Sequence, residues 1–260
     1  MIKEFEERIS LVMDLSVNDF KNKYTESILG YGWAFIQPLV TTVVYWIVFQ
    51  YGLRVGNDDP EIPYVLWFMS GMVPWLFFAD CLGCGLHCYK EYSFLVKKVA
   101  FPMRILPAVK VASALYIHVV FLIFLFGLSM FYGTAQNTHF ALLIYYGILL
   151  VLYAYGAVML ASCLAVFFRD IVQLVQVFLQ VGMWATPVLW NYQLVAPGYR
   201  WIMDLNPMFY ITEGYRQAFL GRGASPDALQ RGLFFLIWGG LLLLSAILFR
   251  RLHIHFADLL

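Results

Sequence analysis

Six apolar stretches, each close to the length of a membrane-crossing helix, constrain this chain more than any other feature. A helix that crosses the hydrocarbon core of a bilayer needs about 20 predominantly apolar residues. The stretches run over Leu29–Leu53, Pro63–Leu86, Val109–Tyr132, Phe140–Phe168, Ile171–Trp190 and Gly232–Phe249. They lack the alternation of polar and apolar residues that marks membrane barrel strands. We therefore expect an all-α polytopic membrane protein with six transmembrane helices.

The composition excludes the main classes of soluble protein. Hydrophobic residues make up 62% of the 260 residues and charged residues 13%, whereas soluble domains average about 45–50% and about 25%. A soluble fold of this size could not cover so much apolar surface, so a cytosolic globular enzyme and a disordered chain are both excluded. The net charge of +1 creates no field that attracts polyanions, and we expect no nucleic-acid partner.

The distribution of basic residues predicts the orientation in the membrane. Lysine and arginine in short loops tend to stay on the cytoplasmic side, and six spans place both termini on one side. Twelve of the 17 lysines and arginines fall on that side. The five on the other side are Arg54, Arg200, Arg216, Arg222 and Arg231. We therefore expect both termini to be cytoplasmic.

We expect residues 1–260 to form a single membrane domain, which opens with an amphipathic interfacial helix over residues 1–28. Ile2, Ile9 and Met13 share one face of that helix, as in helices that lie in the membrane interface. Ser16 and Asp19 have the spacing of a capping box, which predicts that the helix restarts there. The helix is either a plain membrane anchor or a contact with a partner. Residues 29–190 then hold spans one to five, 191–231 a re-entrant segment, and 232–260 span six and the tail.

Two of the segments outside the spans are unusual. Tyr89–Lys110 places Lys97, Lys98 and Arg104 among apolar residues and prolines, which is typical of a loop that binds anionic lipid or of a docking surface for a cytoplasmic subunit. Asn191–Arg231 is long, rich in aromatic residues and broken by proline and glycine. Backbone at membrane depth must be hydrogen-bonded within the protein or line a cavity. We expect two short helices that dip into the outer leaflet and pack on the protein, as an extracellular gate or an interfacial cap.

Two polar stripes follow helical spacing within the spans. Span five carries Gln173, Gln176, Gln180 and Trp184, and span one carries Trp33, Gln37, Thr41, Tyr45 and Phe49. Amides that face lipid tails are costly, so the glutamines must face another helix or a hydrated path. Amides beside flat aromatic rings suit a sugar, whereas the alternative is hydrogen bonding between packed helices.

Few other residues have the chemistry of a site. His118 is expected to be a hydrogen-bonded interior histidine, and Asp80 to pair with His87 or across a dimer interface. Cys81, Cys84 and Cys88 lie on one helical face, without a second ligand pair at zinc-like spacing, so we expect a packing face and no metal site. The sequence has no G-x-x-x-x-G-K-[ST] phosphate loop and no hydrolase motif. We therefore expect a chain that is not an enzyme.

Four motifs in order along the chain resemble those of ABC-2 type permeases that export polysaccharides. The first is Asp19–Leu39, where that family has a D-F-x-x-x-Y pattern and then L-G-x-x-W-x-x-x-x-P. The matching residues are Asp19, Phe20, Tyr24, Leu29, Gly30, Trp33 and Pro38. The others are FFRDI with TPVLW (Phe167–Ile171 and Thr186–Trp190), Asn206–Gly221 and the tail His255–Leu260. The resemblance therefore runs nearly end to end.

The resemblance implies an assembly in the bacterial plasma membrane. It would contain two copies of this chain and two copies of a cytoplasmic ABC ATPase, which would bind ATP and Mg in place of any cofactor in this chain. The implied substrate is a glycan on undecaprenyl diphosphate, of the O-antigen type or a wall teichoic acid. The alternatives are an ABC-2 permease for a drug or simple lipid, and an ATPase-independent carrier or membrane enzyme.

The resemblance also assigns roles to particular residues. The two polar stripes would line the substrate path at the dimer interface. The residues that couple to the ATPase would be Tyr92, Phe94, Lys97, Lys98, Phe101, Arg104, Arg169 and Asp170. The outer gate would contain Trp201, Asn206, Pro207, Tyr210, Glu213, Tyr215 and Arg216.

Overall fold

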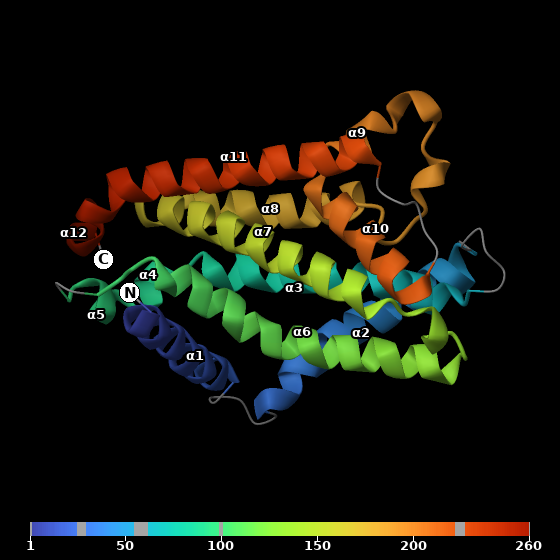
Figure 1. The fold of residues 1–260 in the computed structure, drawn as a ribbon, viewed down its shortest axis with the longest axis horizontal. Helices are drawn as coiled ribbons and strands as arrows, with labels where there is room; N and C mark the ends of the chain where they lie inside the picture. Colours follow the sequence, from blue (N-terminus) through green and yellow to red (C-terminus); the bar gives the residue numbers. More distant parts are fainter. Residues whose placement is uncertain (1, 25–29, 55–61, 99–100, 222–226, 260) are drawn as a thin grey trace.

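The computed structural model describes residues 2–24, 30–54, 62–98, 101–221 and 227–259, and over these residues the chain forms helices and turns without a strand. Long helices run side by side along one axis, and both termini lie at the same end of the bundle (Figure 1). We call this the terminal end and the opposite one the far end. The long helices are α2 (Trp33–Ile47), which continues as the π-helical turn η2 (Val48–Gly52), α3 (Tyr64–Gly85), α6 (Ile105–Phe131), α7 (Phe140–Phe167) and α11 (Ala228–Leu252).

Five helical segments are long and apolar enough to cross a membrane, so the chain is a multi-pass membrane protein. They coincide with five of the six predicted spans. The remaining stretch forms α8 (Asp170–Ala185), which has 16 residues, and a turn over residues 186–190. At 1.5 Å per residue α8 measures about 24 Å, which is less than the ~30 Å hydrocarbon core. The sixth crossing stays a prediction.

Helix α3 forms the centre of the bundle because it is apolar on every side. It packs against α6, α7 and α10 (Pro207–Leu220), and Phe68 and Phe78 are fully buried there. By contrast, α2 and α11 expose apolar side chains such as Val40 (53%) and Leu236 (72%). These outer faces are suited to lipid or to another protein chain.

The N-terminal helix α1 (Ile2–Tyr24) is continuous, so the prediction of a helix restart at Ser16 is wrong. The Ser16 hydroxyl lies mid-helix, where it donates to the Met13 carbonyl and is 2.9 Å from the Tyr116 hydroxyl on α6. Because these contacts satisfy the Ser16 hydroxyl, it is not needed as a helix cap. Nearer the N-terminus, Ile9 and Met13 are about half exposed, which suits a helix in the membrane interface.

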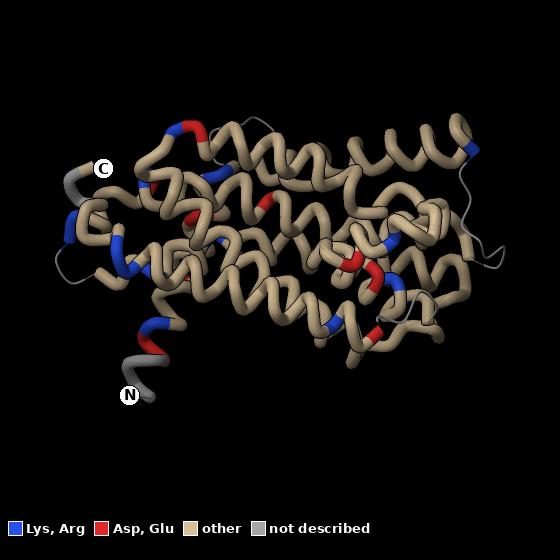
Figure 2. Tube along the Cα trace, turned by 90° about the horizontal axis from the view of Figure 1, so that it is seen from above, with Lys and Arg blue, Asp and Glu red and all other residues tan. Residues whose placement is uncertain are grey.

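Short elements complete both ends of the bundle. The terminal end holds α4 (Cys88–Glu91), α5 (Ser93–Val96), η6 (His253–His255) and α12 (Phe256–Leu259). The other short elements are η1 (Gly30–Gly32), η3 (Ala135–Asn137), η4 (Tyr192–Leu194), η5 (Pro197–Tyr199) and α9 (Trp201–Asp204). Figure 2 shows the charged residues in two groups, one at the terminal end and one towards the far end, with an uncharged stretch between them.

Candidate functional site

The segment between α3 and α6 lies at the terminal end. We call its buried residues Cys88, Tyr89 and Val96 the base, and its exposed residues Phe94, Lys97 and Lys98 the tip. Cys88, Tyr89 and Val96 are buried in a cluster with Phe256 of α12. The rings of Tyr89 and Phe256 lie 4.8 Å apart. The tip exposes Phe94 (61%) beside Lys97 and Lys98, whose side chains are also exposed; residues 99–100 lie outside the described residues. This pairing of a fixed base with an apolar, basic tip is suited to docking a second protein.

The other residues predicted for coupling occupy two places. Phe101 packs against the cluster that holds Tyr89, and the Arg104 guanidinium lies 5.1 Å from the centre of the Phe249 ring on α11. Arg169 and Asp170 are exposed where α7 meets α8. Phe256 was not among the predicted site residues, although it is the only aromatic residue of the six-residue C-terminal motif HFADLL.

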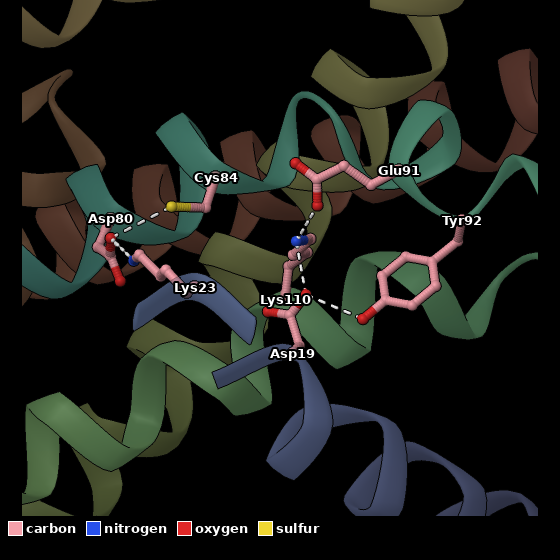
Figure 3. A network of polar contacts seen from close by, with 7 residues as sticks. All are labelled: Asp19, Lys23, Asp80, Cys84, Glu91, Tyr92 and Lys110. Atoms are coloured by element: carbon pink, nitrogen blue, oxygen red, sulfur yellow. Dashed lines mark hydrogen bonds and ion pairs between the residues drawn. The ribbon is translucent and has the colours of Figure 1, made fainter. Parts of the chain in front are cut away.

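A charged network beneath this segment joins three parts of the chain (Figure 3). The Lys110 ammonium on α6 is 2.6 Å from an Asp19 carboxylate oxygen on α1 and also pairs with Glu91 on α4. The Tyr92 hydroxyl donates to the same Asp19 oxygen at 2.9 Å. Burial and the Asp19 carboxylate raise the pKa of Tyr92, so its hydroxyl keeps the proton it donates. Sequence reasoning missed this network, although a lysine within an apolar span usually has a partner.

A second ion pair connects α1 to α3. The Lys23 ammonium lies 2.7 Å from an Asp80 carboxylate oxygen, which also accepts a 3.4 Å hydrogen bond from the Cys84 thiol. Burial acts to lower the pKa of Lys23, but the Asp80 carboxylate outweighs it and the pKa is raised. The prediction that Asp80 pairs with His87 is wrong in this chain, because α1 supplies a full positive charge and His87 is exposed.

Helix α10 is buried towards the far end rather than lying on the surface. Asn206 caps it by accepting from the Met208 amide and donating to the Thr186 hydroxyl, and Pro207 is its first residue. The Tyr210 ring stacks on Phe234 of α11 at 4.8 Å. Trp201 on α9 is 58% exposed. The expectation of packing on the protein is therefore confirmed for α10, and the re-entrant hairpin as a whole stays a prediction.

Within α10, Arg216 is a buried cation with a complete set of partners. It is 1% exposed, pairs with Glu213, donates to the Val188 carbonyl at 2.9 Å and lies 3.8 Å from the centre of the Trp67 ring. Gly71 on α3 provides the space, because a Cβ there would meet the guanidinium at 2.6 Å. Arg216 therefore ties α10 to α3 and to the turn after α8.

Tyr215 and His118 form another polar contact of α10. The His118 ring nitrogen Nε2 lies 3.1 Å from the Tyr215 hydroxyl, and both side chains are buried. The expectation of a hydrogen-bonded interior histidine is confirmed.

The two polar stripes lie in different surroundings. On α8, Gln173, Gln176, Gln180 and Trp184 are all exposed. On α2 the stripe divides. Trp33, Gln37 and Thr41 line a cavity with α3 and α6, Tyr45 packs against the core, and Phe49 is buried. The stripes meet where the rings of Phe49 and Trp184 lie 6.2 Å apart.

Comparison with known proteins shows the family. The model of the ABC-2 type transporter family matches residues 11–220. The chain belongs to this family. ABC-2 permeases are membrane subunits of transporters and work with an ABC ATPase partner. The resemblance seen in the sequence motifs is therefore confirmed at the level of the family.

Relatives match over nearly the whole chain. Two from Klebsiella pneumoniae, both named O-antigen export system permease protein RfbA, are 25% identical over 262 and 260 residues. Each alignment covers 96% of this chain and 95% of the relative. A Myxococcus xanthus protein with the same name is 26% identical over 230 residues, or 88% of this chain and 86% of the relative.

Proposed function

We propose that this chain is the membrane-spanning subunit of an ATP-driven exporter that moves a lipid-linked polysaccharide from the cytoplasmic to the outer side. The observation that carries this proposal is the near end-to-end similarity to permeases named for O-antigen export. The substrate class is a glycan on undecaprenyl diphosphate, either an O-antigen-type chain or a wall teichoic acid.

The exposed tip at the terminal end supports an ATPase partner there. Phe94, Lys97 and Lys98 form its contact surface, while Tyr92, Phe101 and Arg104 join this surface to the bundle. Arg169 and Asp170 are exposed and make supporting contacts. The sequence has no phosphate loop, so ATP and Mg bind to the partner, two copies of which serve two copies of this chain.

The exposed face of α8 supports a homodimer. Its three glutamines would be costly against lipid tails, and a second copy would place them beside a hydrated path bordered by α2 and α8 of each protomer. Aromatic and amide groups there hold sugars weakly at many sites, as conduction requires. α8 and its following turn make the sixth crossing, and α9 with α10 forms the outer gate. Both termini are cytoplasmic in the bacterial plasma membrane, and α1 lies in its interface.

The function is tested by depleting the chain from its own cell. We expect a lipid-linked glycan to accumulate on the cytoplasmic side, and the chain to co-purify with an ABC ATPase. Measurement of the accumulated lipid by mass spectrometry identifies the glycan. If no glycan accumulates and the depleted cell instead loses export of a drug or simple lipid, the proposal is rejected.

Substitution in the substrate path reduces export. Trp33→Ala, Tyr45→Ala, Gln176→Ala and Trp184→Ala each remove one ring or amide, and a contact of about 0.5–1.5 kcal/mol corresponds to a roughly two- to twelvefold slower export. The measurement is glycan export in cells, with assembly checked by size-exclusion chromatography. Leu236→Ala, on the exposed face of α11, is the control and should export normally. Normal export in all four variants would remove the path assignment.

Charge reversal at the tip uncouples the ATPase. We expect Lys97→Glu with Lys98→Glu to lower substrate-stimulated ATP hydrolysis by roughly tenfold, because charge complementarity steers docking. The measurement is ATP hydrolysis by the purified complex. Arg250→Glu with Arg251→Glu is the matched control, since both arginines are exposed in the last turn of α11. Equal hydrolysis by the two double variants would make the tip a lipid contact only.

A further inference from the structure

Two adjoining cavities form one cleft between α1, α2, α3 and α6. The inner cavity has a volume of about 370 Å³, and the outer one about 400 Å³. Lys23, Asp80 and Ala114 line both, so they mark the junction. Glu91 and Lys110 also line the outer cavity.

The inner cavity has the character of a site for an acyl chain. Leu76 and Phe77 of α3 and Ile117 and Phe121 of α6 line it, and α2 closes one side with Trp33. Its wall on α3 runs from Val73 to Asp80, which is about 10 Å along the helix axis. Apolar side chains make up most of the lining, with Gln37, Thr41 and His118 among them, and a bilayer supplies hydrocarbon chains at high concentration.

The outer cavity has the character of a site for a zwitterion. Asp19, Asp80 and Glu91 supply three carboxylates, and Lys23 and Lys110 supply two ammonium groups. The outer cavity therefore carries one more negative than positive charge. We assign the extra negative charge to Glu91, because its side chain is 50% exposed whereas that of its partner Lys110 is 6% exposed. Along the cleft the order is therefore apolar lining, then the Lys23 cation, then a surplus anion.

We propose that this cleft binds one glycerophospholipid whose headgroup carries a primary ammonium group. Its acyl chain fills the inner cavity, its phosphate binds Lys23 at the junction, and its ammonium group binds Glu91. An ammonium has three donors, so Lys23 can bind a phosphate oxygen and keep its bond to Asp80. The order of groups in such a lipid matches the order of the lining.

The same charges select against other lipids. A headgroup with net negative charge would place that charge beside three carboxylates while both lysines are already paired. A diphosphate-linked carrier is disfavoured more strongly, although Trp33, Gln37 and Thr41 of the proposed substrate path also line the inner cavity. The inference depends on the chain lying in a bilayer and not on the nature of its cargo.

The test is native mass spectrometry of the full-length chain with dioleoylphosphatidylethanolamine or dioleoylphosphatidylglycerol. We expect one ethanolamine lipid per chain, bound at least about tenfold more tightly than the glycerol lipid. Gln37→Trp fills the inner cavity from an exposed helix face and should remove this binding. Glu91→Gln should reduce the preference between the two lipids to about twofold or less.

Two controls match these variants. Val40→Trp adds the same ring to the same helix outside the cleft, and Glu7→Gln removes an exposed carboxylate elsewhere on the protein. Both should bind the ethanolamine lipid as the unchanged chain does. Equal binding of the two lipids by the unchanged chain, or undiminished binding by Gln37→Trp, would overturn the proposal.

Discussion

Arg216→Met should lower the Tm of the purified chain by roughly 10 °C. Methionine fills a similar space with an apolar side chain. It leaves the Glu213 carboxylate, which is 6% exposed, without its partner. Breaking a buried ion pair from one side costs about 3–5 kcal/mol, and each kcal/mol shifts Tm by roughly 2–4 °C in a chain of this size. Thermal unfolding in detergent, followed by tryptophan fluorescence, measures the change.

Two further variants separate the charge from the shape. Arg231→Met removes an exposed arginine and should change Tm by less than roughly 2 °C. Arg216→Met with Glu213→Gln removes both charges and should recover much of the loss. If the Tm of Arg216→Met lies within roughly 2 °C of the Tm of the unchanged chain, Arg216 does not hold α10 in the bundle.

Lys110→Met should have a comparable effect at the terminal end. It leaves the Asp19 carboxylate, which is 8% exposed, with Tyr92 as its remaining hydrogen-bond partner within the network of Figure 3. The expected cost is again about 3–5 kcal/mol. Because Lys110 joins α1, α4 and α6, we expect α1 to detach before the bundle unfolds. Limited proteolysis should cut within α1 in this variant under conditions that leave the unchanged chain intact.

A double substitution distinguishes this linkage from general loss of stability. Lys110→Met with Asp19→Asn removes both charges, so the proteolytic protection of α1 should largely return. Lys90→Met is the matched control, because Lys90 is exposed on α4. Protection of α1 in Lys110→Met equal to that in Lys90→Met would mean that the network does not fasten α1.

The terminal-end network connects the tip proposed for ATPase docking to two helices at once. A force on α4 and α5 reaches α6 and α1 through Lys110, and it reaches α11 through the packing of Tyr89 on Phe249 and Phe256. The Lys23–Asp80 pair extends the connection from α1 to α3. These contacts attach the proposed coupling segment to several helices of the bundle.

Sequence reasoning predicted the helical class and six membrane helices, five of which the structure bears out, because these depend on composition and local period. The orientation argument counted Arg216 among the basic residues of the outer side. The fold buries this side chain, which is 1% exposed. The capping box at Ser16 and Asp19 failed for a related reason. A short polar side chain can cap a helix or bind a distant partner, and local spacing does not distinguish these outcomes.

The amino-acid order alone decided that this chain is an all-helical membrane protein, since no soluble fold could cover its apolar residues and only helices satisfy a lipid-embedded backbone of this pattern. It also carried the motifs of the family. Only the tertiary structure decided which group each buried cation meets. Lys110 with Asp19, Lys23 with Asp80 and Arg216 with Trp67 are separated by 91, 57 and 149 positions. Attraction between charges depends on their distance in space, and that distance exists only once the helices have packed.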